Sequence, residues 1–172
     1  VLAFMTPLAG DRWLVQETMC GHMLATAGNE EQSEILRLMK QQAGGKAVVY
    51  EDAASGRGLP ALYKAVCTHH GENTAFNQTR ELLQNTDDPM VRHSLRLFHE
   101  FLGLFAHNAI VTGQGFGGVY LDGGIIHRLR EMGLLDFKTM QPFIAPDVAP
   151  VVRERLAQTP VWAVTDPYDI GI

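Results

Sequence analysis

The sequence is poor in cysteine, in clustered charge and in long apolar runs, and each shortage excludes a class of protein. Only two cysteines occur, Cys20 and Cys67, and their wide separation indicates neither a zinc motif nor a disulfide framework. The net charge is −5, without the clustered lysines and arginines that a nucleic-acid surface needs. No apolar run approaches the roughly 20 residues of a membrane span. These absences predict a cytoplasmic protein that binds neither nucleic acid nor membrane.

What is present is typical of a globular domain. Apolar residues make up 46% of the chain and charged residues 19%, and a length of 172 residues suits one domain or a large part of a bigger protein. The chain opens on an apolar run without the basic flank of a signal peptide, and it stops abruptly after Asp169-Ile170-Gly171-Ile172. We therefore expect a fragment that is truncated at both ends.

Apolar runs and turn signals predict an α/β order. Two short apolar runs at 1–8 and 12–19 predict a hairpin, and Asn29 caps a helix that ends at a glycine pair. Residues 46–50 predict a strand. The other predicted elements are a helix after residues 55–58, a polar helix at 74–85, a long apolar helix at 88–112, a strand at 119–121 that leads into a helix, a helix at 147–157 and a strand at 161–164. This order predicts a mixed central sheet with helices on both faces.

Paired glycines flank the strand predicted at 119–121. Gly117 and Gly118 precede it, and Gly123 and Gly124 lead from it into a helix. Glycines let a ligand approach the backbone closely, and a helix N-terminus offers free N–H groups to an anion. The residues alone leave two explanations open, which are a nucleotide site and tight packing of the strand against the helix.

Two polar residues follow predicted strands. His22 comes after the hairpin and Glu51 after residues 46–50, so both are candidates to bind a ligand rich in hydroxyl groups. Taken singly, each has a plainer explanation. A lone histidine is more often a structural hydrogen-bonding group, and a strand-end carboxylate is more often a solvated charge.

Together these positions resemble the large domain of bacterial glucokinases, within the actin-like, hexokinase-type ATPase clan, across nearly all of residues 1–172. The resemblance is carried by Gly21-His22, by Glu51 with Ser55-Gly56-x-Gly58-Leu59 and Leu62-Tyr63, by the long helix ending in Asn108, by Phe116-Gly117-Gly118-Val119-Tyr120-Leu121-x-Gly123-Gly124-Ile125 and by Pro160-Val161-Trp162. It implies a large C-terminal domain of the ribonuclease-H-like, actin-like fold. It also implies that the parent protein transfers the ATP γ-phosphate to the 6-hydroxyl of glucose.

The resemblance assigns roles to matching positions. His22 and Glu51 fall where the family binds glucose hydroxyls, and the glycines at 117–118 and 123–124 fall in its ATP-binding segment. The implied ligands are glucose and ATP or ADP, with Mg²⁺ accompanying ATP in the parent enzyme. We expect no cofactor bound tightly to this chain. The histidines form no ligand pattern, so we also predict no structural metal.

The departures from the family predict a weakened or incomplete enzyme. The family sugar motif reads Glu-Gly-Gly-His, whereas this chain has Met19 at the first position, and Glu17 lies two residues away. Losing a hydrogen bond to a charged group predicts sugar binding weaker by about 10- to 150-fold. The family's catalytic Asp and Gly-Thr-Gly phosphate loop lie in or beside an N-terminal small domain that this chain lacks. We therefore expect no catalytic residue here and no activity from the isolated chain.

A rival hypothesis is a non-catalytic sugar- or partner-binding domain derived from a degenerate sugar kinase, which Met19 favours. A missing partner domain would also uncover apolar surface. We expect the helix at 88–112 and the first strand, at 2–6, to be partly exposed, and a homodimer to cover them.

Overall fold

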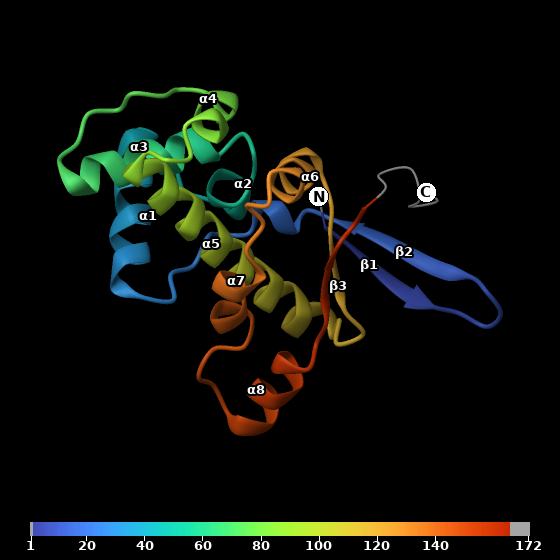
Figure 1. The fold of residues 1–172 in the computed structure, drawn as a ribbon. Helices are drawn as coiled ribbons and strands as arrows, with labels where there is room; N and C mark the ends of the chain where they lie inside the picture. The colour runs from blue at the N-terminus through green and yellow to red at the C-terminus, as the bar shows by residue number, and fades with distance from the viewer. Residues whose placement is uncertain (1, 166–172) are drawn as a thin grey trace.

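A long helix, α5 (Pro89–Gly113), runs through the middle of the molecule (Figure 1). The computed structural model describes residues 2–165, so the chain ends on which the expected truncation rests lie outside the described residues. The other described elements are, in chain order, β1 (Leu2–Pro7), β2 (Trp13–Thr18), the 3₁₀ turn η1 (Cys20–His22), α1 (Glu30–Gln42), α2 (Tyr50–Ala53), α3 (Leu59–His70), α4 (Thr79–Gln84), β3 (Val119–Leu121), α6 (Gly124–Glu131), α7 (Phe137–Ile144), α8 (Pro150–Ala157) and β4 (Val161–Ala163).

Helix α5 begins and ends at residues suited to those positions. The Asp88 side chain accepts hydrogen bonds from the N–H groups of Met90 and Val91, at 2.8 and 3.0 Å, and Pro89 occupies the first turn. The helix ends before Gln114, which adopts the left-handed conformation with φ of 53°. This confirms the long helix predicted at 88–112. No helix of the described part of the chain is long and apolar enough to cross a membrane.

The core forms around α5 because its neighbours cover most of its circumference. Helix α7 packs against one side, α3 against another, and α1 against α3. Gly103 permits the closest approach, since a β-carbon there would lie 2.6 Å from the carbonyl oxygen of Met140 on α7. The largest fully buried side chains are Tyr50, Tyr63, Phe98, Phe101, Ile35, Leu59, Leu62, Leu82, Leu97, Ile110, Leu129 and Met140.

A buried polar contact fixes α1 against α5. The Gln32 amide is fully buried and donates to Glu100 Oε2 at 2.7 Å, while its oxygen accepts from the Gly28 N–H at 2.6 Å. Arg96 forms an ion pair with Glu100 at the edge of this contact. Each of these buried polar groups therefore has a hydrogen-bond partner, which offsets the cost of removing it from water.

The described residues form two separate two-stranded sheets in place of the mixed central sheet that the sequence predicts. Strands β1 and β2 make an antiparallel hairpin, with Leu2 opposite Thr18 and Pro7 opposite Trp13. Strands β3 and β4 pair in parallel, with Leu121 opposite Ala163. The hairpin prediction is confirmed, and so is the mixed α/β composition.

The strand predicted at residues 46–50 is wrong, and this changes the setting of Glu51. Val49 forms only an isolated bridge with Leu24, and Tyr50 already begins helix α2. The Asp52 carboxylate accepts from the Val49 N–H at 3.0 Å, which caps α2 and ends the extended segment. Glu51 therefore lies in the first turn of a short helix and not at the end of a strand.

Most other predicted elements are present with shorter bounds. Asn29 caps α1 as expected, since its side chain accepts from the Gln32 N–H at 2.8 Å. The helices predicted at 74–85 and 147–157 shrink to α4 and α8. Helix α7 was not predicted, although Asp136 caps it with hydrogen bonds from the next turn. Pro142 inside α7 masks its helical signal.

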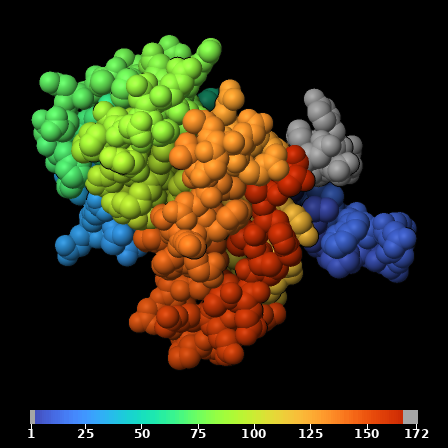
Figure 2. Space-filling model, viewed as in Figure 1, coloured from blue at the N-terminus to red at the C-terminus, as the bar shows by residue number. Residues whose placement is uncertain are grey.

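Of the two elements expected to be exposed, the first strand is exposed together with the rest of its hairpin. Met5, Leu8, Trp13, Leu14 and Val15 are all about half exposed. Figure 2 shows the hairpin projecting from one side of the molecule. The expectation fails for most of α5, because its long run of apolar side chains is buried by α3 and α7.

His99 is a buried imidazole that joins α5 to the start of α7. Its Nδ1–H donates to the Leu95 carbonyl oxygen at 2.6 Å, and its Nε2 accepts from the Asp136 N–H at 3.2 Å. Only 2% of the side chain is exposed, and burial lowers the pKa of His99 below its ordinary value. Protonation would also place a second N–H against the Asp136 donor, so the neutral ring fits the fold.

We predict that the free energy of unfolding decreases as the pH falls from about 7.5 to 5.5, and that His99→Gln flattens this dependence. In that window His99 takes up a proton in the unfolded chain, whereas the buried ring of the folded protein stays neutral. The free energy of unfolding should therefore change by up to about 1.4 kcal/mol per pH unit. Urea unfolding at a series of pH values measures it. His69→Gln, at the exposed end of α3, is the control. An unchanged slope in His99→Gln would contradict the assignment.

Candidate functional site

The predicted sugar residues His22 and Glu51 meet in space. His22 ends η1 directly after β2, and Glu51 lies in the first turn of α2. The two segments are joined through the backbone, because the Tyr50 N–H donates to the Met23 carbonyl oxygen at 3.0 Å. As a result His22 Nε2 lies 3.8 Å from Glu51 Oε2.

The polar atoms of this pair remain accessible. The His22 side chain is 59% exposed and that of Glu51 35% exposed. Their separation of 3.8 Å is longer than a hydrogen bond, so neither group satisfies the other. Arg57 donates to Glu51 Oε1 from the loop that follows α2. The arrangement offers a carboxylate acceptor and an imidazole to one hydroxyl-rich ligand.

A hydrogen-bonded tyrosine fixes the helix that carries Glu51. Tyr50 is buried, and its hydroxyl lies 2.7 Å from Thr26 Oγ1 and accepts from Asn108 Nδ2 at 2.8 Å. Asn108 belongs to α5, so the position of Glu51 is set by the central helix. Sequence reasoning missed this contact. Two features of the sequence could have indicated it, namely a tyrosine directly before Glu51 and an asparagine near the end of a helix predicted to be buried.

Met19 leaves the acceptor position of the predicted sugar motif without an oxygen. Its side chain is 75% exposed beside η1. Glu17 lies two residues before Met19 and is paired with Ala3 within the hairpin. Because it is held in this strand pair and not in a loop, it does not take the place of the missing acceptor. Gly21 is not required sterically, because a β-carbon there would lie 3.8 Å from Glu51 Oε2, an ordinary contact.

The loop between α2 and α3 connects the Glu51 region to the glycine turn. Ser55 Oγ accepts from the Gly58 N–H at 3.1 Å, and the Thr79 hydroxyl donates to the Gly56 carbonyl oxygen. Gly56 packs closely on α6, since a β-carbon there would lie 3.3 Å from Ile125 Cβ. The loop therefore bridges the two predicted binding regions.

The two glycine pairs lie at opposite ends of β3 and are not brought together. Gly118 has φ of 140°, and its Cα faces the ring of Trp162, which a β-carbon would overlap. For Gly118 the structure supplies the packing explanation. Gly123 has φ of 111°, and a β-carbon on Gly123 or Gly124 would meet nothing within 4 Å. A β-carbon on Gly117 would also meet nothing within 4 Å, but of the two pairs the second is the one at a helix N-terminus, that of α6.

A second ion pair spans the glycine turn. His127 Nε2 lies 2.6 Å from Asp122 Oδ1, which joins the end of β3 to the first turn of α6. Within residues 2–165 no group of three or more His, Cys, Asp or Glu side chains could hold a metal ion.

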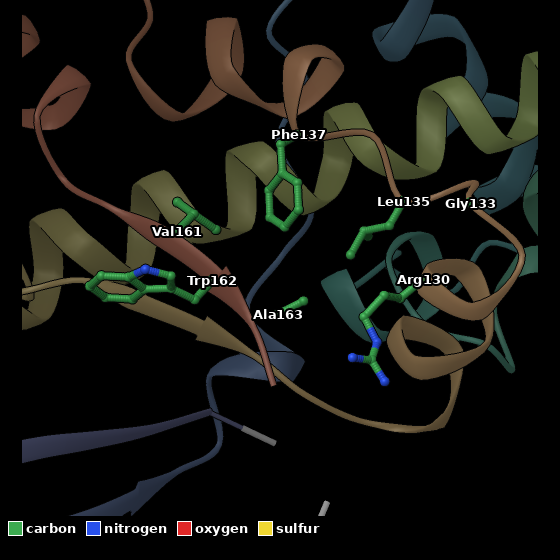
Figure 3. Close-up of a pocket in the computed structure, with 7 residues that line it drawn as sticks. All are labelled: Arg130, Gly133, Leu135, Phe137, Val161, Trp162 and Ala163. Carbon is green, nitrogen blue, oxygen red and sulfur yellow. The ribbon is translucent and has the colours of Figure 1, made fainter. Parts of the chain in front are cut away.

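A hollow of about 350 Å³ lies elsewhere, between β4 and the end of α6 (Figure 3). Its lining includes Arg130, Phe137 and Trp162 and none of the predicted site residues. Figure 3 shows Phe137 of α7 and Arg130 of α6 on two sides of it, while the Trp162 ring extends along β4 away from both.

Comparison with protein families shows to which family this chain belongs. The glucokinase family model matches residues 3–169. The chain belongs to the glucokinase family. It is 28% identical to a glucokinase of Paramagnetospirillum magneticum over 174 aligned residues, covering 95% of this chain and 50% of that protein. It is 32% identical to a glucokinase of Hahella chejuensis, covering 91% of this chain and 48% of that protein.

Two solved structures share the fold. A glucokinase from an Antarctic psychrotroph matches with a TM-score of 0.74 and 22% identity, covering 90% of this chain and 47% of its own. A glucokinase of Balamuthia mandrillaris in complex with glucose matches with a TM-score of 0.77 and 20% identity, covering 96% and 47%. This glucokinase-family chain thus spans about half the length of these four relatives.

We predict that Gly124→Ala weakens ADP binding about tenfold, or about 1.4 kcal/mol, because a methyl group would fill the open space above the turn. The fold should be unaffected, since alanine is a better helix former than glycine. Titration followed by NMR measures the weak binding expected of an isolated chain. Gly115→Ala is the control, with its nearest atom 3.9 Å away. If Gly124→Ala and the unsubstituted chain bind ADP with equal affinity, or if neither binds it saturably, the assignment of the nucleotide to this turn is wrong.

Proposed function

We propose that this chain is the sugar- and adenosine-binding part of an ATP-dependent glucokinase that transfers the γ-phosphate to the 6-hydroxyl of glucose. The convergence of His22 and Glu51, within a family match over residues 3–169, carries the proposal. In it, Glu51 accepts hydrogen bonds from sugar hydroxyls and His22 contacts a neighbouring hydroxyl. The Gly123-Gly124 turn lies against adenosine, and the reaction belongs to cytoplasmic glycolysis.

Phosphoryl transfer depends mainly on positioning and on stabilising charge, so a half-enzyme can bind without reacting. We assign no catalytic residue to this chain, because the family resemblance places the proton-accepting Asp and the phosphate loops outside it. The residues 2–165 offer no acidic cluster for Mg²⁺. Mg²⁺ would enter on the phosphates of ATP.

We further infer that the two small sheets belong to one ribonuclease-H-like, actin-like domain with a mixed central sheet and helices on both faces. The similarity of fold to two glucokinases supports this. An N-terminal small domain would complete the active site. The exposed apolar hairpin, with Trp13 56% exposed, supports a homodimer formed by this domain.

The rival proposal is a non-catalytic sugar- or partner-binding domain. Met19 favours it, because the position that carries the family's acidic sugar ligand is 75% exposed and has no acceptor. The carboxylate of Glu51 would then hold a sugar without a second acidic group. The two proposals differ in whether an added small domain restores turnover.

We predict that the purified 172-residue chain shows no ATP-dependent phosphorylation of glucose above background. The reason is that the proton acceptor and phosphate loops lie elsewhere in the family pattern. A coupled assay for glucose 6-phosphate measures this, with the glucokinase of Hahella chejuensis as the positive control. Robust turnover would contradict the proposal and assign the base to an Asp of this chain, such as Asp52 or Asp122.

A chimera separates the kinase from its rival. This chain would replace the matching part of the Hahella chejuensis glucokinase, which is 32% identical to it. The kinase proposal predicts turnover that Glu51→Gln reduces. The binding-domain proposal predicts a folded chimera without turnover.

A further inference from the structure

Arg57 occupies one oxygen of the carboxylate that the proposed function assigns to sugar. Its Nη2 donates to Glu51 Oε1, while His22 lies 3.8 Å from Oε2. The Arg57 side chain is 88% exposed, and its other N–H groups have no hydrogen-bond partner among residues 2–165. The guanidinium therefore covers Glu51 from the solvent side without being buried itself.

The loop places Arg57 in this position. Arg57 lies six residues after Glu51, on the turn that follows α2. The turn is fixed on both sides by the Ser55–Gly58 hydrogen bond and by the contact between Thr79 and Gly56. Gly58 has no room for a side chain, because a β-carbon would overlap the Asp52 carbonyl. The backbone is thus held, and only the Arg57 side chain is free to leave.

We propose that Arg57 is a positioning residue that competes with the sugar for Glu51 and so lowers the affinity of the site for neutral sugars. This rests on the proposed function, since it places a sugar at Glu51. The two oxygens of a carboxylate offer about four acceptor sites, and Arg57 occupies one of those on Oε1. A sugar that donates one hydroxyl to each oxygen must therefore approach Oε1 where the guanidinium already lies. The guanidinium can move aside into solvent, which its exposure permits.

The charges around Glu51 agree with competition. His22 and Arg57 are the groups that contact its carboxylate, and the neighbouring Asp52 is engaged by the Val49 N–H at 3.0 Å. The Arg57 contact is an exposed ion pair, so it is weak enough for a ligand to displace and is screened by salt. A buried pair at this position would instead block the site.

The test measures glucose affinity of the full chain by calorimetry or NMR titration. Arg57→Gln is expected to tighten glucose binding about two- to fivefold, the range of one exposed ion pair. Arg57→Lys, which keeps the charge, should restore affinity near that of the unsubstituted chain. Raising KCl from about 50 to 500 mM should tighten binding by the unsubstituted chain but not by Arg57→Gln.

Two controls confine the effect to Glu51. In a Glu51→Gln background, Arg57→Gln should change glucose affinity no further, because the shared partner is gone. Arg37→Gln removes a comparable exposed ion pair, with Glu34 on α1 at 2.7 Å, and should leave affinity unchanged.

The outcomes separate this proposal from the function on which it rests. If the unsubstituted chain binds glucose and Arg57→Gln binds it equally or more weakly, competition is wrong and Arg57 is neutral or a sugar ligand itself. If no variant binds glucose at saturating concentrations, the sugar site fails and this inference fails with it.

Discussion

Burial of α5 is the constraint on which the rest of the structure depends. Helix α5 is apolar around most of its circumference, so α3 and α7 must cover it, and Gly103 lets α7 approach closely. Its buried polar side chains are few and hydrogen-bonded, as with Glu100 against Gln32. Near its C-terminal end, Asn108 donates to the Tyr50 hydroxyl. One buried helix therefore sets both the core and the helix that carries Glu51.

The candidate site is built from short segments that this core holds in place. His22 and Glu51 lie on a 3₁₀ turn and a four-residue helix, neither of which would be stable alone. Backbone hydrogen bonds between the two segments stabilise them despite their shortness. The contact of Gly56 with Ile125 extends this support to the glycine turn.

Sequence reasoning succeeded where local chemistry decides structure. Asp88 and Asn29 are strong caps, so both of their helices were predicted. It failed at residues 46–50, where β-branched residues favour a strand but the Asp52 side chain caps α2. Strand length and sheet pairing depend on distant partners, which explains why one central sheet was predicted and two small sheets are found.

The site was predicted unevenly for a similar reason. His22 and Glu51 were identified through resemblance, because neither residue is distinctive alone, and the structure brings them together. The distinct settings of Gly118 and Gly124 depend on Trp162, a residue far along the chain, so sequence gave no way to separate packing from open space. Arg57 escaped notice because its contact with Glu51 crosses a turn whose geometry only the fold defines.

We propose that glucose binds between His22 and Glu51. The most direct measurement is an NMR titration of the histidine ring nitrogens with D-glucose, with L-glucose as the stereochemical control. The account predicts that His22 resonances shift saturably with D-glucose alone, that His69 resonances stay fixed, and that Glu51→Gln abolishes the shift. Unchanged His22 resonances at saturating D-glucose, or equal shifts with both enantiomers, would contradict it.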